Sequence, residues 1–185
     1  MSQKDAASDH LRVGLSGAFA LARGQREGME AMPAGPRAAS LSFWAAAICL
    51  PAFVALRLLA WNGLGAPARP IHAMLAAILL FVIGWAGYAV LSHRVVAVLG
   101  RAPQWPRFIV AWNWCNVAQY ALFLAASVPG LLGVPTWMDQ TLSLVALFWA
   151  LWLQWYAARL ALRIAALPAL MMVALDALIG LLLAG

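Results

Sequence analysis

The chain has 185 residues, of which 65% are hydrophobic and 10% are charged, whereas a soluble domain carries about 25% charged residues. This composition excludes an ordinary soluble domain, because a chain of this length could not bury so much apolar sequence in water. The net charge of +6 comes from basic residues between apolar runs, where they contact anionic headgroups, so we expect a lipid bilayer and not nucleic acid as partner.

The first 40 residues form a polar segment that precedes the apolar runs. Its apolar residues recur at helical spacing, at Leu11, Leu15, Phe19 and Ala22. This pattern predicts an amphipathic helix in the headgroup plane, and the alternatives are a frayed polar tail or a helix that docks on a partner. Gly14, Gly17 and Gly24 each weaken such a helix by about 1 kcal/mol relative to Ala. No apolar run follows Lys4, so we expect no signal peptide.

Five apolar runs follow, and each is long enough to cross a membrane, since about 20 residues at 1.5 Å each cover a ~30 Å hydrocarbon core. The predicted transmembrane helices are 41–61, 71–91, 108–128, 141–158 and 165–184. The second run can extend as a helix through Val98, and Pro129 and Gly130 predict a break after the third. Five spans cannot form two equal halves, which counts against an inverted-repeat transporter within one chain.

The predicted fold class is therefore all-α: a polytopic membrane helix bundle of about five transmembrane helices with an N-terminal amphipathic segment. Residues 1–40 are expected to be a cytoplasmic tail, and residues 41–185 the transmembrane domain. Pro51 lies inside the first span, where neighbouring helices can satisfy the carbonyl group that a proline leaves free.

The Lys and Arg residues of each loop predict which side of the membrane it faces. Basic residues fill the N-terminal segment and alternate loops, at Lys4, Arg12, Arg23, Arg26 and Arg37, then Arg94, Arg101 and Arg107, then Arg159 and Arg163. The first loop on the other side holds Arg69, and the loop at 129–140 holds no basic residue. We therefore expect a cytoplasmic N-terminus and a periplasmic C-terminus. The abundance of Arg, Ala, Gly and Trp is typical of a bacterial chain.

Polar side chains inside the third and fourth spans form one candidate binding site. Asn113, Asn116 and Gln119 share a face of the third span, and Gln154 lies on the antiparallel fourth. Asn113 and Gln154 each lie about 7 Å below the cytoplasmic side, which predicts a hydrogen bond between them. Such residues either pack helices together or line a pocket for a substrate or a lipid headgroup, and the sequence leaves both interpretations open.

Two charged residues also lie inside predicted spans, Arg57 in the first and Asp176 near the middle of the last. A carboxylate at that depth costs a few kcal/mol unless it is paired or protonated. Depths of about 21 Å and 16 Å from the cytoplasmic side bring the two side chains within reach if their helices touch. The alternatives are an ion pair, a neutral Asp176 that bonds a backbone carbonyl, and a proton-coupled site.

The sequence carries no pattern typical of catalysis. His10, His72 and His93 are scattered along the chain, and Cys49 and Cys115 lie inside apolar runs, where a free cysteine behaves as a small hydrophobic residue. We therefore predict no catalytic residue, no metal site and no cofactor.

Short aromatic motifs give the chain a resemblance to known proteins. They are Ser42-Phe43-Trp44, Ala111-Trp112-Asn113-Trp114 and Gln154-Trp155-Tyr156-Ala157-Ala158-Arg159-Leu160-Ala161-Leu162. With them, the chain resembles a group of small bacterial five-span inner-membrane proteins without an assigned activity, and more distantly the Ypt-interacting-protein (Rab-interacting) family. The resemblance covers residues 41–185 and implies a fold and a location but no catalytic residues. It marks Asn113, Trp114, Trp155 and Arg159 as positions that matter at the cytoplasmic interface.

Three functions are compatible with these observations. The sequence favours a non-enzymatic protein that organises the membrane or binds partners, either other membrane proteins or further copies of itself. The first alternative is a small oligomeric transporter or channel that uses Asp176 and the polar face of the third span. The second is a lipid-modifying enzyme with a headgroup site at Arg94, Arg101, Arg107, Arg159 and Arg163.

Overall fold

The computed structural model describes the backbone of residues 3–184 and the side chains of residues 10–183 except Leu64. In this part of the chain the elements are helices, and no strand occurs. They are α1 (Gln3–Ala22), α2 (Glu27–Ala31), α3 (Pro36–Ser42), α4 (Trp44–Leu64), α5 (Pro70–Val98), a 3-10 turn (Ala102–Gln104), α6 (Trp105–Leu131), α7 (Thr136–Leu162) and α8 (Ala166–Ala184). The predicted all-α class is confirmed.

Five helical stretches are long and apolar enough to cross a membrane. They are Pro36–Gly63, Pro70–Val98, Ala102–Leu131, Thr136–Leu162 and Ala166–Leu183. By length and composition the chain is therefore a multi-pass membrane protein. The helices α5, α6 and α7 have 29, 27 and 27 residues, or about 40 Å each, so they extend beyond a ~30 Å hydrocarbon core.

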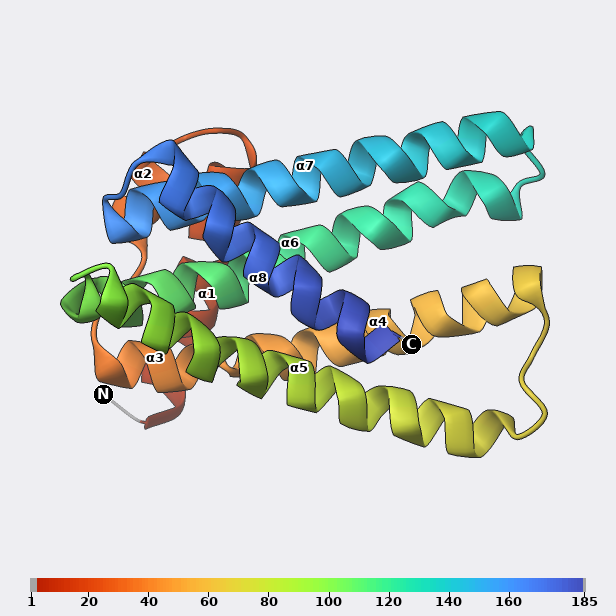
Figure 1. Ribbon diagram of the computed structural model, residues 1–185, viewed down its shortest axis with the longest axis horizontal. Coiled ribbons are helices and arrows are strands. Elements are labelled where there is room, and N and C mark those ends of the chain that lie inside the picture. Colours follow the sequence, from red (N-terminus) through yellow and green to blue (C-terminus); the bar gives the residue numbers. More distant parts are fainter. Residues whose placement is uncertain (1–2, 185) are drawn as a thin grey trace.

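The long helices form two hairpins, α4 with α5 and α6 with α7, and α8 runs obliquely between them (Figure 1). The hairpins lie close together at the end that carries α1 to α3, which we call the N-terminal end, and spread apart toward the other end. The last helix packs on α7 and on α5. At the centre lies α6, in whose most apolar stretch 61% of the residues are buried, against 11% to 33% in the other four spans.

Most helices are longer than the sequence predicted. The extension of α5 through Val98 is confirmed. The predicted break at Pro129 and Gly130 is wrong, because α6 continues to Leu131. A proline so near the end of a helix removes only one backbone hydrogen bond. The chain turns instead at Gly133, whose φ of 76° suits a residue without a Cβ.

The first span has an unpredicted interruption. Helix α3 begins at Pro36 and ends at Ser42, and α4 starts at Trp44, so the helical path begins before the predicted boundary at residue 41. Pro51 lies within α4, which continues through it as expected.

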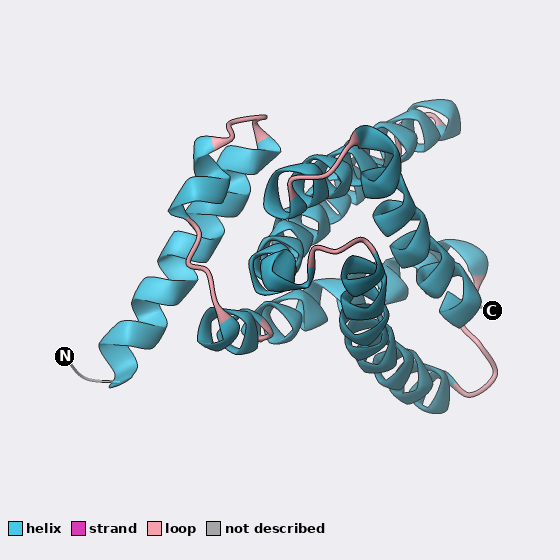
Figure 2. Cartoon of the chain, turned by 60° about the vertical axis from the view of Figure 1, so that its left-hand side comes forward, coloured by secondary structure: helices cyan, strands magenta, loops and turns pink. Residues whose placement is uncertain are grey.

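The N-terminal segment folds against the bundle and runs across its end (Figures 1 and 2). The predicted helix is present as α1, and Leu11, Leu15 and Ala22 pack against the core. Phe19 departs from the predicted stripe, since 44% of it is exposed. The lipid environment of α1 stays a prediction.

Two of the glycines that weaken α1 as an isolated helix are its contact points. A Cβ on Gly14 would collide with the indole of Trp114 on α6, and a Cβ on Gly17 would lie 2.8 Å from the carbonyl oxygen of Gly28 on α2. The small residues therefore allow α1 to approach both helices closely. We call α1, α2 and the turn between them the N-terminal layer. Two further hydrogen bonds hold this layer against the bundle, from Arg107 Nη2 to the Met29 carbonyl (2.9 Å) and from the Tyr156 hydroxyl to the Gly24 carbonyl (2.8 Å).

Candidate functional site

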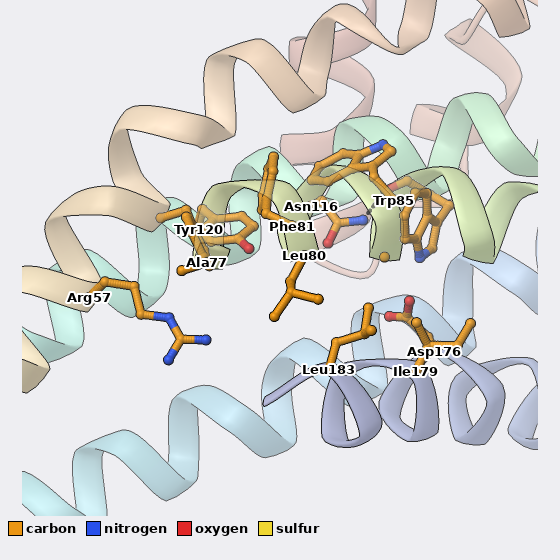
Figure 3. Close-up of a pocket in the computed structure, with 14 residues that line it drawn as sticks. Arg57, Ala77, Leu80, Phe81, Trp85, Asn116, Tyr120, Asp176, Ile179 and Leu183 are labelled. Atoms are coloured by element: carbon orange, nitrogen blue, oxygen red, sulfur yellow. Dashed lines mark hydrogen bonds between the residues drawn. The ribbon is translucent and has the colours of Figure 1, made fainter. Parts of the chain in front are cut away.

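A cavity of about 220 Å³ lies between α4, α5, α6 and α8 (Figure 3). Its polar and aromatic lining includes Arg57 from α4, Trp85 from α5, Trp112, Asn116 and Tyr120 from α6, and Asp176 from α8. Both charged residues of the predicted spans therefore line the same cavity.

The depth of the cavity follows from the positions of these residues along their helices. Arg57 comes 13 residues after Trp44, where α4 begins, which is about 20 Å along the axis. Asp176 comes 10 residues after Ala166, where α8 begins, which is about 15 Å. Both helices start at the N-terminal end, so the cavity lies well inside the spans.

The carboxyl group of Asp176 meets the polar face of α6 through Gln154. The Nε2 atom of Gln154 donates a 2.6 Å hydrogen bond to Asp176 Oδ2 and lies 3.5 Å from Gln119 Oε1. The indole of Trp112 lies beside the same carboxyl group, yet its buried Nε1 completes no hydrogen bond among the described residues, and neither does Gln119 Nε2. The carboxyl group of Asp176 is thus bonded to Gln154, and the residue remains half-buried at the edge of the cavity.

Arg57 forms no ion pair with Asp176, so the first of the three alternatives that the sequence left open for these residues is wrong. The guanidinium carbon of Arg57 lies 5.4 Å from the ring centre of Phe53, one turn earlier on its own helix. Figure 3 shows Arg57 and Asp176 at opposite ends of the cavity, with Leu80 and Leu183 between them. The physical reason is that α8 packs on α7 and α5, so a similar depth does not bring the two charged groups into contact.

The predicted pair of Asn113 and Gln154 is also wrong. Asn113 Oδ1 accepts a 2.6 Å hydrogen bond from Trp85 Nε1, and its Nδ2 donates a 2.7 Å bond to Ser42 Oγ. Asn113 therefore joins α6 to α5 and α3, away from Gln154. Because it is fully buried, this residue packs helices together and does not face the cavity.

The polar face of α6 consequently serves two purposes. Asn113, Asn116 and Gln119 are all buried, but among them only Asn116 lines the cavity, together with Tyr120. Asn116 donates from Nδ2 to the Trp112 carbonyl at 2.9 Å, which leaves its amide oxygen directed toward the cavity (Figure 3). The packing interpretation therefore holds for Asn113, and the binding interpretation stays a prediction for Asn116, which lines the cavity.

Aromatic rings form one wall of the cavity, and sequence reasoning missed them. The ring centres of Phe81 and Trp85 are 5.2 Å apart, and so are those of Trp85 and Trp112. Tyr88 stacks on Trp112 at 4.4 Å. The signal was present, because Phe81, Trp85 and Tyr88 follow one another at spacings of four and three residues and so share a helix face.

Arg159 belongs to a different region. It is exposed near the end of α7, with its guanidinium carbon 4.8 Å from the ring centre of Trp155. Trp155 in turn donates from Nε1 to the Ala166 carbonyl at 3.1 Å, which ties α7 to the start of α8. The residues that the resemblance marked are thus structural contacts at the N-terminal end, and Arg159 takes no part in the cavity.

Nothing outside this chain assigns the site. No protein-family model, curated protein or solved structure matches the sequence, and the resemblance to five-span inner-membrane proteins stays a prediction. Within the described residues, no group of three or more His, Cys, Asp or Glu is placed to hold a metal ion. The candidate functional site is therefore defined by its own geometry, as a polar cavity inside a bundle of membrane-spanning helices.

Proposed function

We propose that the protein binds a small polar solute in the cavity and carries it across the membrane. The observation that supports this proposal is that Arg57 and Asp176 both line one cavity without forming an ion pair with each other. A charged side chain at the centre of a membrane costs about 2.5–3.5 kcal/mol on insertion scales. Two such residues that line one cavity are typical of a solute pathway, whereas a purely structural pair would form an ion pair with each other.

This proposal exchanges the order of the functions that the sequence favoured. The sequence alone placed a non-enzymatic organising or partner-binding protein first and a small transporter second. Transport gains support from Asn116 and Tyr120, which add an amide and a phenol group to the cavity lining. An oligomeric state is part of the same proposal, since five spans in one chain lack the two equal halves of many transporters.

We also propose that the protein lies in a bacterial inner membrane with its N-terminus in the cytoplasm. The loops of the bundle support this orientation. Arg101 and Arg163 lie in loops at the N-terminal end, together with Arg23 after α1, and the loops at the opposite end carry Arg69 alone. Loops rich in Lys and Arg stay in the cytoplasm.

Flux measurements on purified protein in liposomes test the transport proposal. The liposomes are loaded in turn with radiolabelled glucose, phosphate, choline or glycine, and with a pH-sensitive dye for protons. We expect flux of at least one of them, and Asp176→Asn should abolish it because this change removes the negative charge from the cavity and leaves that of Arg57 uncompensated. Glu30→Gln is the control, since Glu30 is exposed on α2. Wild-type liposomes that move no solute and no proton would contradict the proposal.

A partner-binding role is the second candidate, and one observation favours it. The turn between α1 and α2 exposes Arg23 and Arg26, and Glu27 and Glu30 are exposed on α2. The layer is fixed to the bundle by the hydrogen bonds of Arg107 and Tyr156, so it presents a rigid charged surface. Pull-down from mild detergent should then recover the same partners with the wild type and lose them with Arg23→Glu and Arg26→Glu together.

A further inference from the structure

We propose that the ligand of the cavity is a small zwitterion, in which an ammonium group and an anionic group are joined by a short apolar linker. The ammonium group lies at Asp176 and the anionic group at Arg57. This inference rests on the proposed function and adds the class of ligand to it. It starts from the placement of the two charges at opposite ends of one cavity, with Leu80 and Leu183 between them (Figure 3).

The charges select for a ligand that is neutral overall. A simple cation would be attracted by Asp176 but repelled by Arg57, and a simple anion would meet the reverse. These interactions are stronger in the cavity than in bulk water, because the surrounding bundle and lipid have a low dielectric constant. A zwitterion compensates both charges at once and leaves no buried charge without a partner.

The side chains at each end fit the same orientation. At one end, Asp176 Oδ2 is held by Gln154, and the aromatic wall of Trp85 and Trp112 lines the cavity nearby. An ammonium group is stabilised both by a carboxylate and by the faces of aromatic rings. At the other end, Arg57 offers the planar set of donors that matches a carboxylate or a phosphate. The leucines between them match an apolar linker.

Three probes of similar length separate the charge classes. They are γ-aminobutyrate, which carries both charges, butylammonium, which carries only the cation, and butyrate, which carries only the anion. Their binding to the full-length protein is measured by equilibrium dialysis in nanodiscs made of phosphatidylglycerol. We expect γ-aminobutyrate to bind about tenfold or more tightly than either singly charged probe, since one charged hydrogen bond accounts for about that factor.

Charge substitutions give a signature that a merely structural role would not produce. Arg57→Gln should weaken γ-aminobutyrate binding about tenfold and strengthen butylammonium binding, because the repulsion is gone. Asp176→Asn should strengthen butyrate binding in the same way. Arg57→Lys should restore the preference for γ-aminobutyrate, and Arg94→Gln, on an exposed side chain of α5, should leave all three affinities unchanged.

Two further outcomes define the limits of the inference. Equal affinity of the wild type for butylammonium and γ-aminobutyrate, or absence of binding by all three probes, overturns the zwitterion assignment. The proposed function survives either result if a thiol introduced by Gly180→Cys in the cavity still reacts with a charged, water-soluble reagent, and fails if it does not. Added phosphatidylethanolamine distinguishes the source: competition assigns the site to a lipid headgroup, and its absence assigns it to a free solute.

Discussion

The loss of Asn113 should weaken the bundle. This residue connects three helices through hydrogen bonds with Trp85 and Ser42, and it is fully buried. Asn113→Leu keeps a similar volume but removes both bonds. Interhelical hydrogen bonds in membranes average about 0.6 kcal/mol and reach about 1.7 kcal/mol, and the buried indole nitrogen of Trp85 is left without an acceptor. We expect the free energy of unfolding to fall by about 1–3 kcal/mol.

The same substitution three residues later provides a matched control. Asn116 bonds only to the Trp112 carbonyl on its own helix, so Asn116→Leu should change the free energy of unfolding by less than about 0.6 kcal/mol. Unfolding is followed by tryptophan fluorescence as sodium dodecyl sulfate is titrated into mild-detergent micelles. If Asn113→Leu destabilises the protein no more than Asn116→Leu does, the three-helix connection has no energetic role.

Two further predictions concern the N-terminal layer and the orientation. Gly14→Val places a side chain against Trp114 and should detach α1, at a cost of about 1–3 kcal/mol. Limited proteolysis should then cleave α1 faster, while Ser16→Val on the exposed face should behave as the wild type; equal cleavage rates would argue against close packing. For the orientation, alkaline phosphatase fused after Ala66 should be active outside the cytoplasm, and the same enzyme fused after Ala102 should be inactive. The reverse pattern would invert the proposed topology.

The sequence predicted the elements well because span length and hydropathy are local properties. Five runs of about 20 apolar residues specify five helices whatever their neighbours do. The ends were less certain, since α7 continues through Arg159 to Leu162 and stops only at Arg163, which adopts a left-handed conformation with φ of 52°. No hydropathy pattern signals that turn.

The partners of the polar residues could not be predicted in the same way. Counting residues along a helix gives the depth of a side chain but not the direction in which it points, nor which helices touch. Asn113 and Gln154 lie at similar depth, yet each bonds to residues on other helices. Arg57 and Asp176 share a cavity without contact because α8 packs on α7 and α5. Which helices lie side by side is a property of the whole bundle, and it determines whether residues at similar depth can bond to each other.

Solute transport requires that water reaches the cavity, and two neighbouring positions on α8 test this requirement directly. Gly180 and Leu181 are both exposed, but only Gly180 lines the cavity, where a Cβ would meet no atom within 4 Å. Leu181 is 72% exposed and is not part of the cavity lining. Native Cys49 and Cys115 are buried and contribute little background.

The measurement is the labelling rate of Gly180→Cys and Leu181→Cys in intact membranes by a trimethylammonium methanethiosulfonate, which is charged and does not enter lipid. We predict that Gly180→Cys reacts, that Leu181→Cys does not, and that Asp176→Asn slows the labelling of Gly180→Cys because the carboxylate no longer attracts the cationic reagent. Gly180→Cys as unreactive as Leu181→Cys would show a closed bundle and contradict the account.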